Sequence, residues 1–128
     1  MSGIYPIFDL PVPSADRFDG KGLSANLEGL DEIAASLSLP LLSQFIDSHT
    51  MMREVLDEED IPADCPPERW YSAQEGLTTV DGLLLHRHQH PEQISRDGDV
   101  VVMDLEHLAL LLNDAELQSA RFQLLVDL

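Results

Sequence analysis

The sequence predicts an α+β fold that is mostly helical, with a small sheet in which the N- and C-terminal strands pair. The first observation is the alternation in RFQLLVDL at the C-terminus, which places Phe122, Leu124 and Val126 on the core side of a strand. Such a strand needs a partner, and the other clear strand pattern is IYPIFDL at 4–10. The third observation is helical spacing of apolar residues between these two strands. A length of 128 residues corresponds to a single domain, residues 1–128.

The first half of the chain is expected to contain an edge strand followed by a helix. Pro6 has no backbone N–H to donate, so it confines its strand to an edge of the sheet or to the strand's first residues. A connection rich in Pro, Gly and Asp follows over 11–22. A helix is expected next, and Pro40 ends it. Its apolar face consists of Leu23, Leu27, Leu30, Ala34 and Leu37.

The middle of the chain is predicted to be largely irregular. Short helices are expected at 41–46 and 51–56, and the segment EEDIPADCPPERWY at 58–71 contains three prolines. Long ordered loops are either functional or packed by their own apolar residues. Trp70 and Tyr71 are expected to provide that packing, and the alternative is that they bind a partner.

Two long helices are predicted in the second half. The pattern SAQE opens the first, because the Ser72 hydroxyl can accept a hydrogen bond from the Glu75 amide, and Pro91 ends it. The second helix runs from about Val101 to Ser119. Residues 100–103 stay open between the start of this helix and a strand.

The net charge restricts the possible partners. The chain has 24 acidic residues against seven basic ones, a formal charge of −17. Such a field repels the phosphates of nucleic acids and anionic membrane surfaces, so neither is expected as a partner. It attracts a basic protein and can speed the encounter by a factor of roughly 10 to 1000. The alternative is that the acidity only keeps the protein soluble.

Eight of the 24 acidic residues form two groups along the sequence. The predicted partner-binding surface combines the first group with the aromatic pair beside the proline-rich loop, and consists of Asp57, Glu58, Glu59, Asp60, Trp70 and Tyr71. The second group is interpreted as solvated surface and consists of Asp97, Asp99, Asp104 and Glu106. Neither group has the apolar enclosure that acid–base catalysis by paired carboxylates requires, nor the spacing of a calcium loop.

Three histidines, His86, His88 and His90, occupy the predicted last turn before Pro91. In a helix His86 and His90 share a face while His88 points away. A stable structural metal site needs four ligands, and no further Cys, His, Asp or Glu stands at a diagnostic spacing. The preferred interpretation is a helix end whose cations complement the helix dipole, so no metal and no other cofactor is expected.

The motifs of common enzyme classes are missing from the sequence. There is no GxSxG, GxxxxGK[ST], GxGxxG or HExxH pattern, and the single cysteine, Cys65, cannot form an intramolecular disulfide or a CxxC metal site. The expected function is therefore a non-enzymatic, acidic protein-binding module. Its size and charge are those of bacterial immunity proteins that neutralise basic nuclease toxins, an analogy that rests on no shared motif.

Two alternatives stay open. The first is a metal-handling protein that uses the histidines, and the second is a structural subunit of an assembly, with Met51 and Met52 or Trp70 and Tyr71 as its apolar contact. The N-terminus lacks the basic start and apolar core of a signal peptide, and no apolar run approaches the ~20 residues of a membrane span. A cytoplasmic location is expected.

Overall fold

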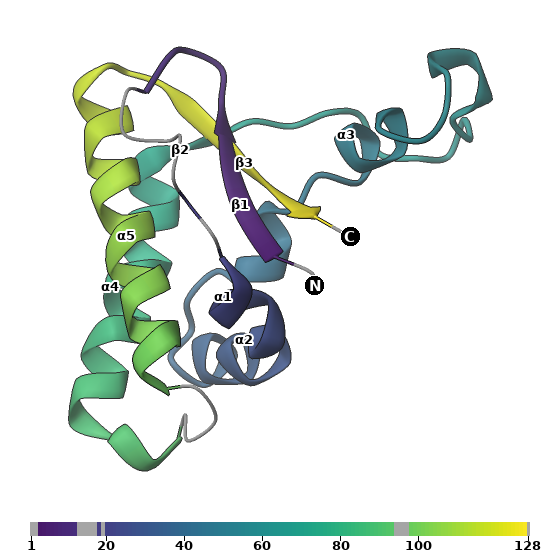
Figure 1. Cartoon of the computed structure of the whole chain (residues 1–128). Helices are drawn as coiled ribbons and strands as arrows, with labels where there is room; N and C mark the ends of the chain where they lie inside the picture. The colour runs from purple at the N-terminus through teal and green to yellow at the C-terminus, as the bar shows by residue number, and fades with distance from the viewer. Residues whose placement is uncertain (1–2, 13–17, 19, 94–97, 128) are drawn as a thin grey trace.

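The computed structural model describes residues 3–12, 18, 20–93 and 98–127. A three-stranded antiparallel sheet has the order β1-β3-β2, so the C-terminal strand β3 (Arg121–Asp127) is central. It lies between the N-terminal strand β1 (Gly3–Phe8) and the short strand β2 (Tyr71–Ser72). The predicted pairing of the terminal strands is confirmed, and Figure 1 shows β1 and β3 running side by side.

Strand β1 is an edge strand, as Pro6 predicts. Ile4 lies opposite Val126 and Phe8 opposite Phe122 in the pairing with β3. On the outer edge of β1 the amide of Ile4 donates to the carbonyl of Gly20 at 3.1 Å. Pro6 lies two residues further on, where its missing N–H points to the same outer edge and breaks no pairing with β3.

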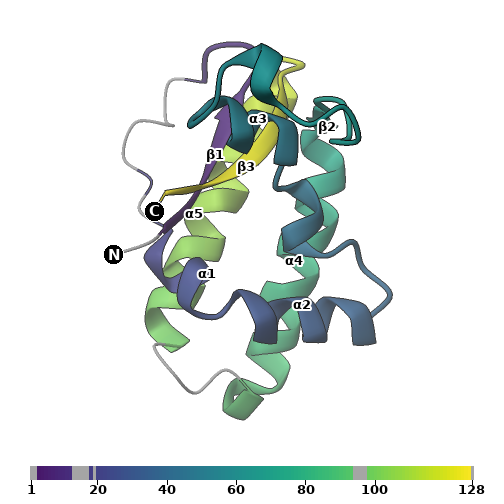
Figure 2. The same cartoon turned by 90° about the vertical axis from the view of Figure 1, so that its right-hand side faces the viewer.

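Two long helices form the other layer of the fold. Helices α4 (Ala73–Gln89) and α5 (Gly98–Leu117) lie side by side. Figure 2 shows the sheet against the upper part of this pair, and α1 (Lys21–Ala25) and α2 (Leu27–Ser36) across its lower part. The predicted cap of α4 is present, because the Glu75 amide donates to the Ser72 hydroxyl at 3.1 Å. The fully buried side chains include Leu83, Leu105, Leu108, Leu112, Phe122 and Leu124.

Residues 100–103 belong to α5, which decides the open question in favour of the helix. The single helix predicted over 23–37 is not continuous. It is divided at Asn26 into α1 and α2. The Asn26 side chain donates to the carbonyl of Gly22 at 2.9 Å, a local bond that competes with helix continuation. Leu23, Leu30 and Ala34 are buried as predicted, whereas Leu37 is exposed after the end of α2.

Four more short helical segments are present among the described residues. Three are the 3-10 turns η2 (Leu42–Phe45), η3 (Glu58–Asp60) and η4 (Pro91–Gln93). The α-helix α3 (Ser48–Arg53) follows η2. The short helix expected at 41–46 corresponds to η2. The one expected at 51–56 corresponds to α3, which begins and ends three residues earlier than predicted. Half of the expected connection over 11–22, residues 13–17 and 19, lies outside the described residues. Its last two residues already belong to α1, so the connection ends earlier than predicted.

The prediction of a one-sided C-terminal strand is wrong. Phe122 and Leu124 are buried as expected, but Gln123 is fully buried and Leu125 is also buried. The Gln123 side chain donates to the carbonyl of Arg69 at 3.0 Å, so the segment before β2 covers this face. A central strand covered on both faces loses the polar side that simple alternation assumes.

The interpretation of Asp104 as solvated surface is also wrong. Its side chain is only 9% exposed and accepts hydrogen bonds from the amides of Gly22 at 2.8 Å and Leu23 at 3.3 Å. These amides open α1, where unpaired N–H groups need an acceptor and favour negative charge. The carboxylate of Asp104 thus fixes α1 to α5. Asp99 and Glu106 are exposed as predicted, and Asp97 lies outside the described residues.

Candidate functional site

The residues between α3 and β2 form an arm that extends away from the sheet and the long helices (Figure 1). We call residues 54–68 the acidic arm. Asp57, Glu58, Glu59 and Asp60 are all exposed on it, as the sequence predicts. The two residues before them, Val55 and Leu56, are also exposed, and Val55 is 79% exposed. The arm therefore presents a short apolar element next to four carboxylates.

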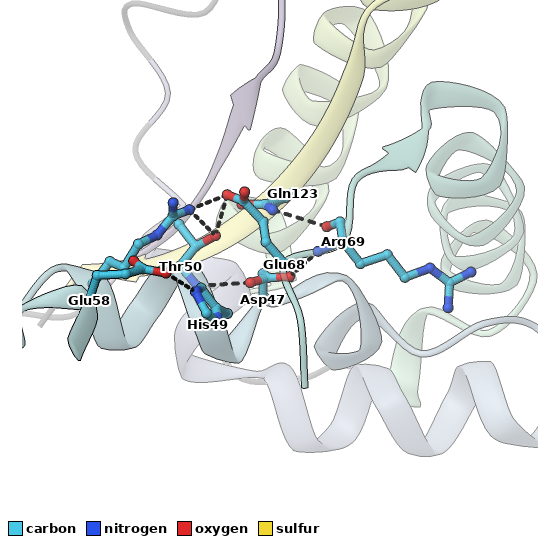
Figure 3. A network of polar contacts seen from close by, with 8 residues as sticks. Asp47, His49, Thr50, Glu58, Glu68, Arg69 and Gln123 are labelled. Atoms are coloured by element: carbon cyan, nitrogen blue, oxygen red, sulfur yellow. Dashed lines mark hydrogen bonds and ion pairs between the residues drawn. The ribbon is translucent and has the colours of Figure 1, made fainter. Parts of the chain in front are cut away.

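A buried carboxylate holds the base of the acidic arm together. Asp47 is 7% exposed, and its two oxygens accept from the Thr50 amide and from the Arg69 amide, each at 2.8 Å. The first bond caps α3, and the second fixes the chain where it returns to the sheet. Figure 3 shows Asp47 between these two segments, with Gln123 of β3 bonded to the same returning chain.

Three further contacts order the arm. Arg53 forms an ion pair with Glu68, and the Thr50 hydroxyl donates to Glu68 at 3.1 Å, so the two ends of the arm are joined. His49 and Glu58 approach to 3.0 Å between Nε2 and Oε1, which ties η3 back to α3. Exposed ion pairs of this kind contribute about 0–1 kcal/mol each. The base of the arm is consequently fixed mainly by Asp47. We call residues 57–60 the tip of the arm; its four carboxylates are exposed, and Glu58 is the one that also contacts His49.

The two aromatic residues, Trp70 and Tyr71, differ in their burial. Tyr71 is 9% exposed, its ring lies 5.0 Å from that of Phe45, and its hydroxyl donates to the carbonyl of Gln44 at 3.0 Å. It therefore has the packing role that we preferred. Trp70 is partly buried beside it. Of the predicted partner-binding residues, the structure brings the four carboxylates to one exposed tip and places Tyr71 in the core.

The histidines lie at the end of α4, as predicted. The rings of His86 and His90 are 4.8 Å apart, and His88 is exposed. His90 Nδ1 lies 3.7 Å from a carboxylate oxygen of Glu92. Within the part of the chain that the structure describes, no group of three or more His, Cys, Asp or Glu side chains is placed to hold a metal ion.

We expect zinc to leave the melting temperature unchanged. Replacing His86→Ala together with His90→Ala should change the unfolding free energy by less than about 1 kcal/mol, the scale of a charge at a helix end. Thermal unfolding with and without Zn²⁺ measures both effects, and His88→Ala on the exposed face is the matched control. A zinc-dependent rise that the double variant loses would instead favour the metal-handling function.

Sequence reasoning missed an acidic groove on α2. Its lining consists of Leu27, Glu28, Asp31, Glu32, Ala35 and Leu41, and its volume is about 490 Å³. The acidic residues at one-turn spacing were visible in the sequence, but Leu41 comes from the chain beyond Pro40 and joins them only in the fold. A second, larger groove of about 700 Å³ lies between the end of α4 and the start of α5, where His88, Met103 and Glu106 contribute to its lining.

No helix among the described residues is both long enough and apolar enough to cross a membrane. Comparison with protein-family models, with curated proteins and with solved structures finds no match to this chain.

Proposed function

We propose that this protein is a non-enzymatic, cytoplasmic binding module whose acidic arm engages a basic protein. The observation that carries the proposal is the exposed tip of Asp57, Glu58, Glu59 and Asp60 on an arm with an ordered base. The net charge of −17 adds long-range attraction for a cationic partner.

An ordered base favours binding by the tip. Asp47 fixes both ends of the arm, so less conformational freedom is lost when a partner engages it than for an unattached loop of the same composition. Val55 and Leu56 beside the carboxylates add an apolar contact of the kind that protein interfaces bury. A partner whose surface has a cationic cleft with an apolar wall would match this combination of carboxylates and apolar side chains. An inhibitor or immunity protein that covers the active site of a basic toxin is the functional class that we propose.

The association rate with the basic partner should fall steeply as salt is added. The screening length shortens from about 8 Å at physiological ionic strength to about 3 Å at 1 M, and charge attraction acts mainly on the on-rate. Neutralising the tip with Asp57→Asn, Glu58→Gln and Glu59→Gln should slow association about tenfold or more while the melting temperature stays within a few degrees, because exposed charges contribute little stability. The measurement is stopped-flow association with the partner obtained by affinity capture.

The matched control removes the same number of charges elsewhere. Asp81→Asn, Asp99→Asn and Glu106→Gln are exposed positions on α4 and α5. This control should slow association less than the tip variant does, if the tip meets the partner. A salt-insensitive on-rate that the tip variant leaves unchanged would show that the acidity serves solubility and that recognition occurs elsewhere, for example at Trp70.

A further inference from the structure

The outer face of α2 forms a groove with the chain that follows Pro40. Leu27 and Ala35 lie two turns apart along the helix, and Leu41 faces them from the second segment. The exposed lining of this groove is almost entirely apolar. The groove is shallow and open to solvent, with a volume of about 490 Å³. An apolar side chain of a partner can therefore lie against this lining.

Carboxylates surround this apolar lining. Glu28 and Glu32 are exposed and stand one helical turn apart, and Asp31 lies between them in sequence. The Asp31 carboxylate accepts from the Ser43 amide at 3.3 Å, which joins the two walls of the groove. Among the described residues no cation pairs with Glu28 or Glu32. Like charges at this spacing repel each other, so a cation from outside would be attracted to both.

We infer that this groove binds a basic amphipathic segment of a partner protein. An apolar side chain of that segment fills the space between Leu27, Ala35 and Leu41. A neighbouring lysine or arginine lies against Glu28 and Glu32, where it relieves their mutual repulsion. A second copy of this chain is disfavoured as the occupant, because two molecules of charge −17 repel each other.

The inference goes beyond the proposed function, because the groove and the acidic arm are different surfaces. The groove lies on α2, which crosses the lower part of the helix pair in Figure 2, whereas the arm follows α3 at the opposite end. Either surface can bind without the other. A partner that uses both would gain affinity from two contacts at once.

The experiment titrates the full-length protein with a short synthetic amphipathic helix made of leucine and lysine. Binding is followed by the methyl NMR signals of Leu27, Ala35 and Leu41 and by fluorescence anisotropy of the labelled peptide. The titration is made at physiological ionic strength, where attraction between charges of the protein and the peptide is screened beyond about 8 Å. The methyl signals of the groove should shift on titration, and those of Val55 and Leu56 on the arm should shift less.

Two groove variants and one matched control locate the binding. Glu28→Gln with Glu32→Gln should weaken the peptide's affinity about tenfold, whereas Asp57→Asn with Glu59→Gln removes the same charge from the arm and should weaken it less than threefold. Ala35→Gln keeps the net charge, preserves helix propensity and places a polar group among the apolar lining, so it should also weaken binding several-fold. All three variants alter exposed positions, and thermal unfolding verifies that each one is folded.

Four results would overturn the inference. Equal losses in the two charge variants would show diffuse attraction without a preferred surface. A loss in the arm variant alone would support the proposed function and reject the groove. A peptide of leucine and glutamate that binds equally well would remove the role of Glu28 and Glu32. Groove signals that shift when the protein is concentrated without peptide would make a second copy the occupant.

Discussion

Deletion of residues 121–128 should abolish cooperative unfolding, because it removes the strand that pairs with both other strands of the sheet. Strand β3 joins β1 to β2, and its side chains are buried on both faces. Without it the inner faces of α4 and α5 lose much of their cover. The single substitution Leu124→Ala should lower the unfolding free energy by about 2–5 kcal/mol, as other large-to-small changes in a core do. That loss is a large part of the roughly 5–15 kcal/mol of a typical domain.

Urea unfolding followed by circular dichroism measures this effect. Leu117→Ala is the matched control, because it makes the same chemical change at a side chain that is 85% exposed. Its effect should stay within about 0.5 kcal/mol. A truncated protein that still melts cooperatively would mean that β3 is not needed for the fold.

Gly20→Ala should be strongly destabilising. The backbone of Gly20 has a φ of +72°, in the left-handed region where a residue with a side chain is disfavoured by about 1–2 kcal/mol. A Cβ atom built there would lie 1.7 Å from the carbonyl oxygen of Ile4. The backbone must move to remove this overlap, and the hydrogen bond from Ile4 to Gly20 would be strained or lost. We expect a loss greater than the 1–2 kcal/mol of the conformational term alone.

Gly29→Ala should stabilise the protein, the opposite of the effect expected at Gly20. Gly29 lies within α2, and a Cβ atom there would have no neighbour within 4 Å. Alanine in an exposed helix interior is favoured over glycine by about 0.5–1 kcal/mol. The two variants make the same chemical change, so opposite shifts of the melting temperature would isolate the effect of the Gly20 conformation. A small effect at both positions would contradict the close approach of Gly20 to β1.

The elements that periodicity specifies were predictable, and those that depend on distant contacts were not. The apolar spacing in α5 follows directly from the face that this helix buries. For β3 the pattern predicted a strand and its pairing with β1, although both faces of this strand are covered. Strand β2 has two residues, too few for a pattern, and it forms because Phe122 and Arg121 lie opposite it. The burial of Gln123 depends on the carbonyl of Arg69, which is far away in sequence.

The candidate surfaces show the same division. The exposure of Asp57, Glu58, Glu59 and Asp60 was predictable, because a run of carboxylates cannot be buried without partners. The base of the arm was not, since Asp47 looks like any other acidic residue until it meets the Arg69 amide. Asp104 was misassigned for the same reason. A sequence does not distinguish a carboxylate that caps a distant helix from one that faces water.

The central place of β3 determines when the protein can fold during its synthesis. Residue 4 pairs with residue 126, so almost the whole described chain must be translated before β1 meets its neighbour. Until then β1 and β2 have no strand between them, and the apolar sides of α4 and α5 are open to other nascent chains. Contacts between residues so far apart form slowly, because the long intervening loop must close first. Of the three described strands, β3 is the last to be made and the one that closes the sheet. Ribosome-bound chains that end before it leave apolar surface uncovered, which exposes them to aggregation and to chaperones.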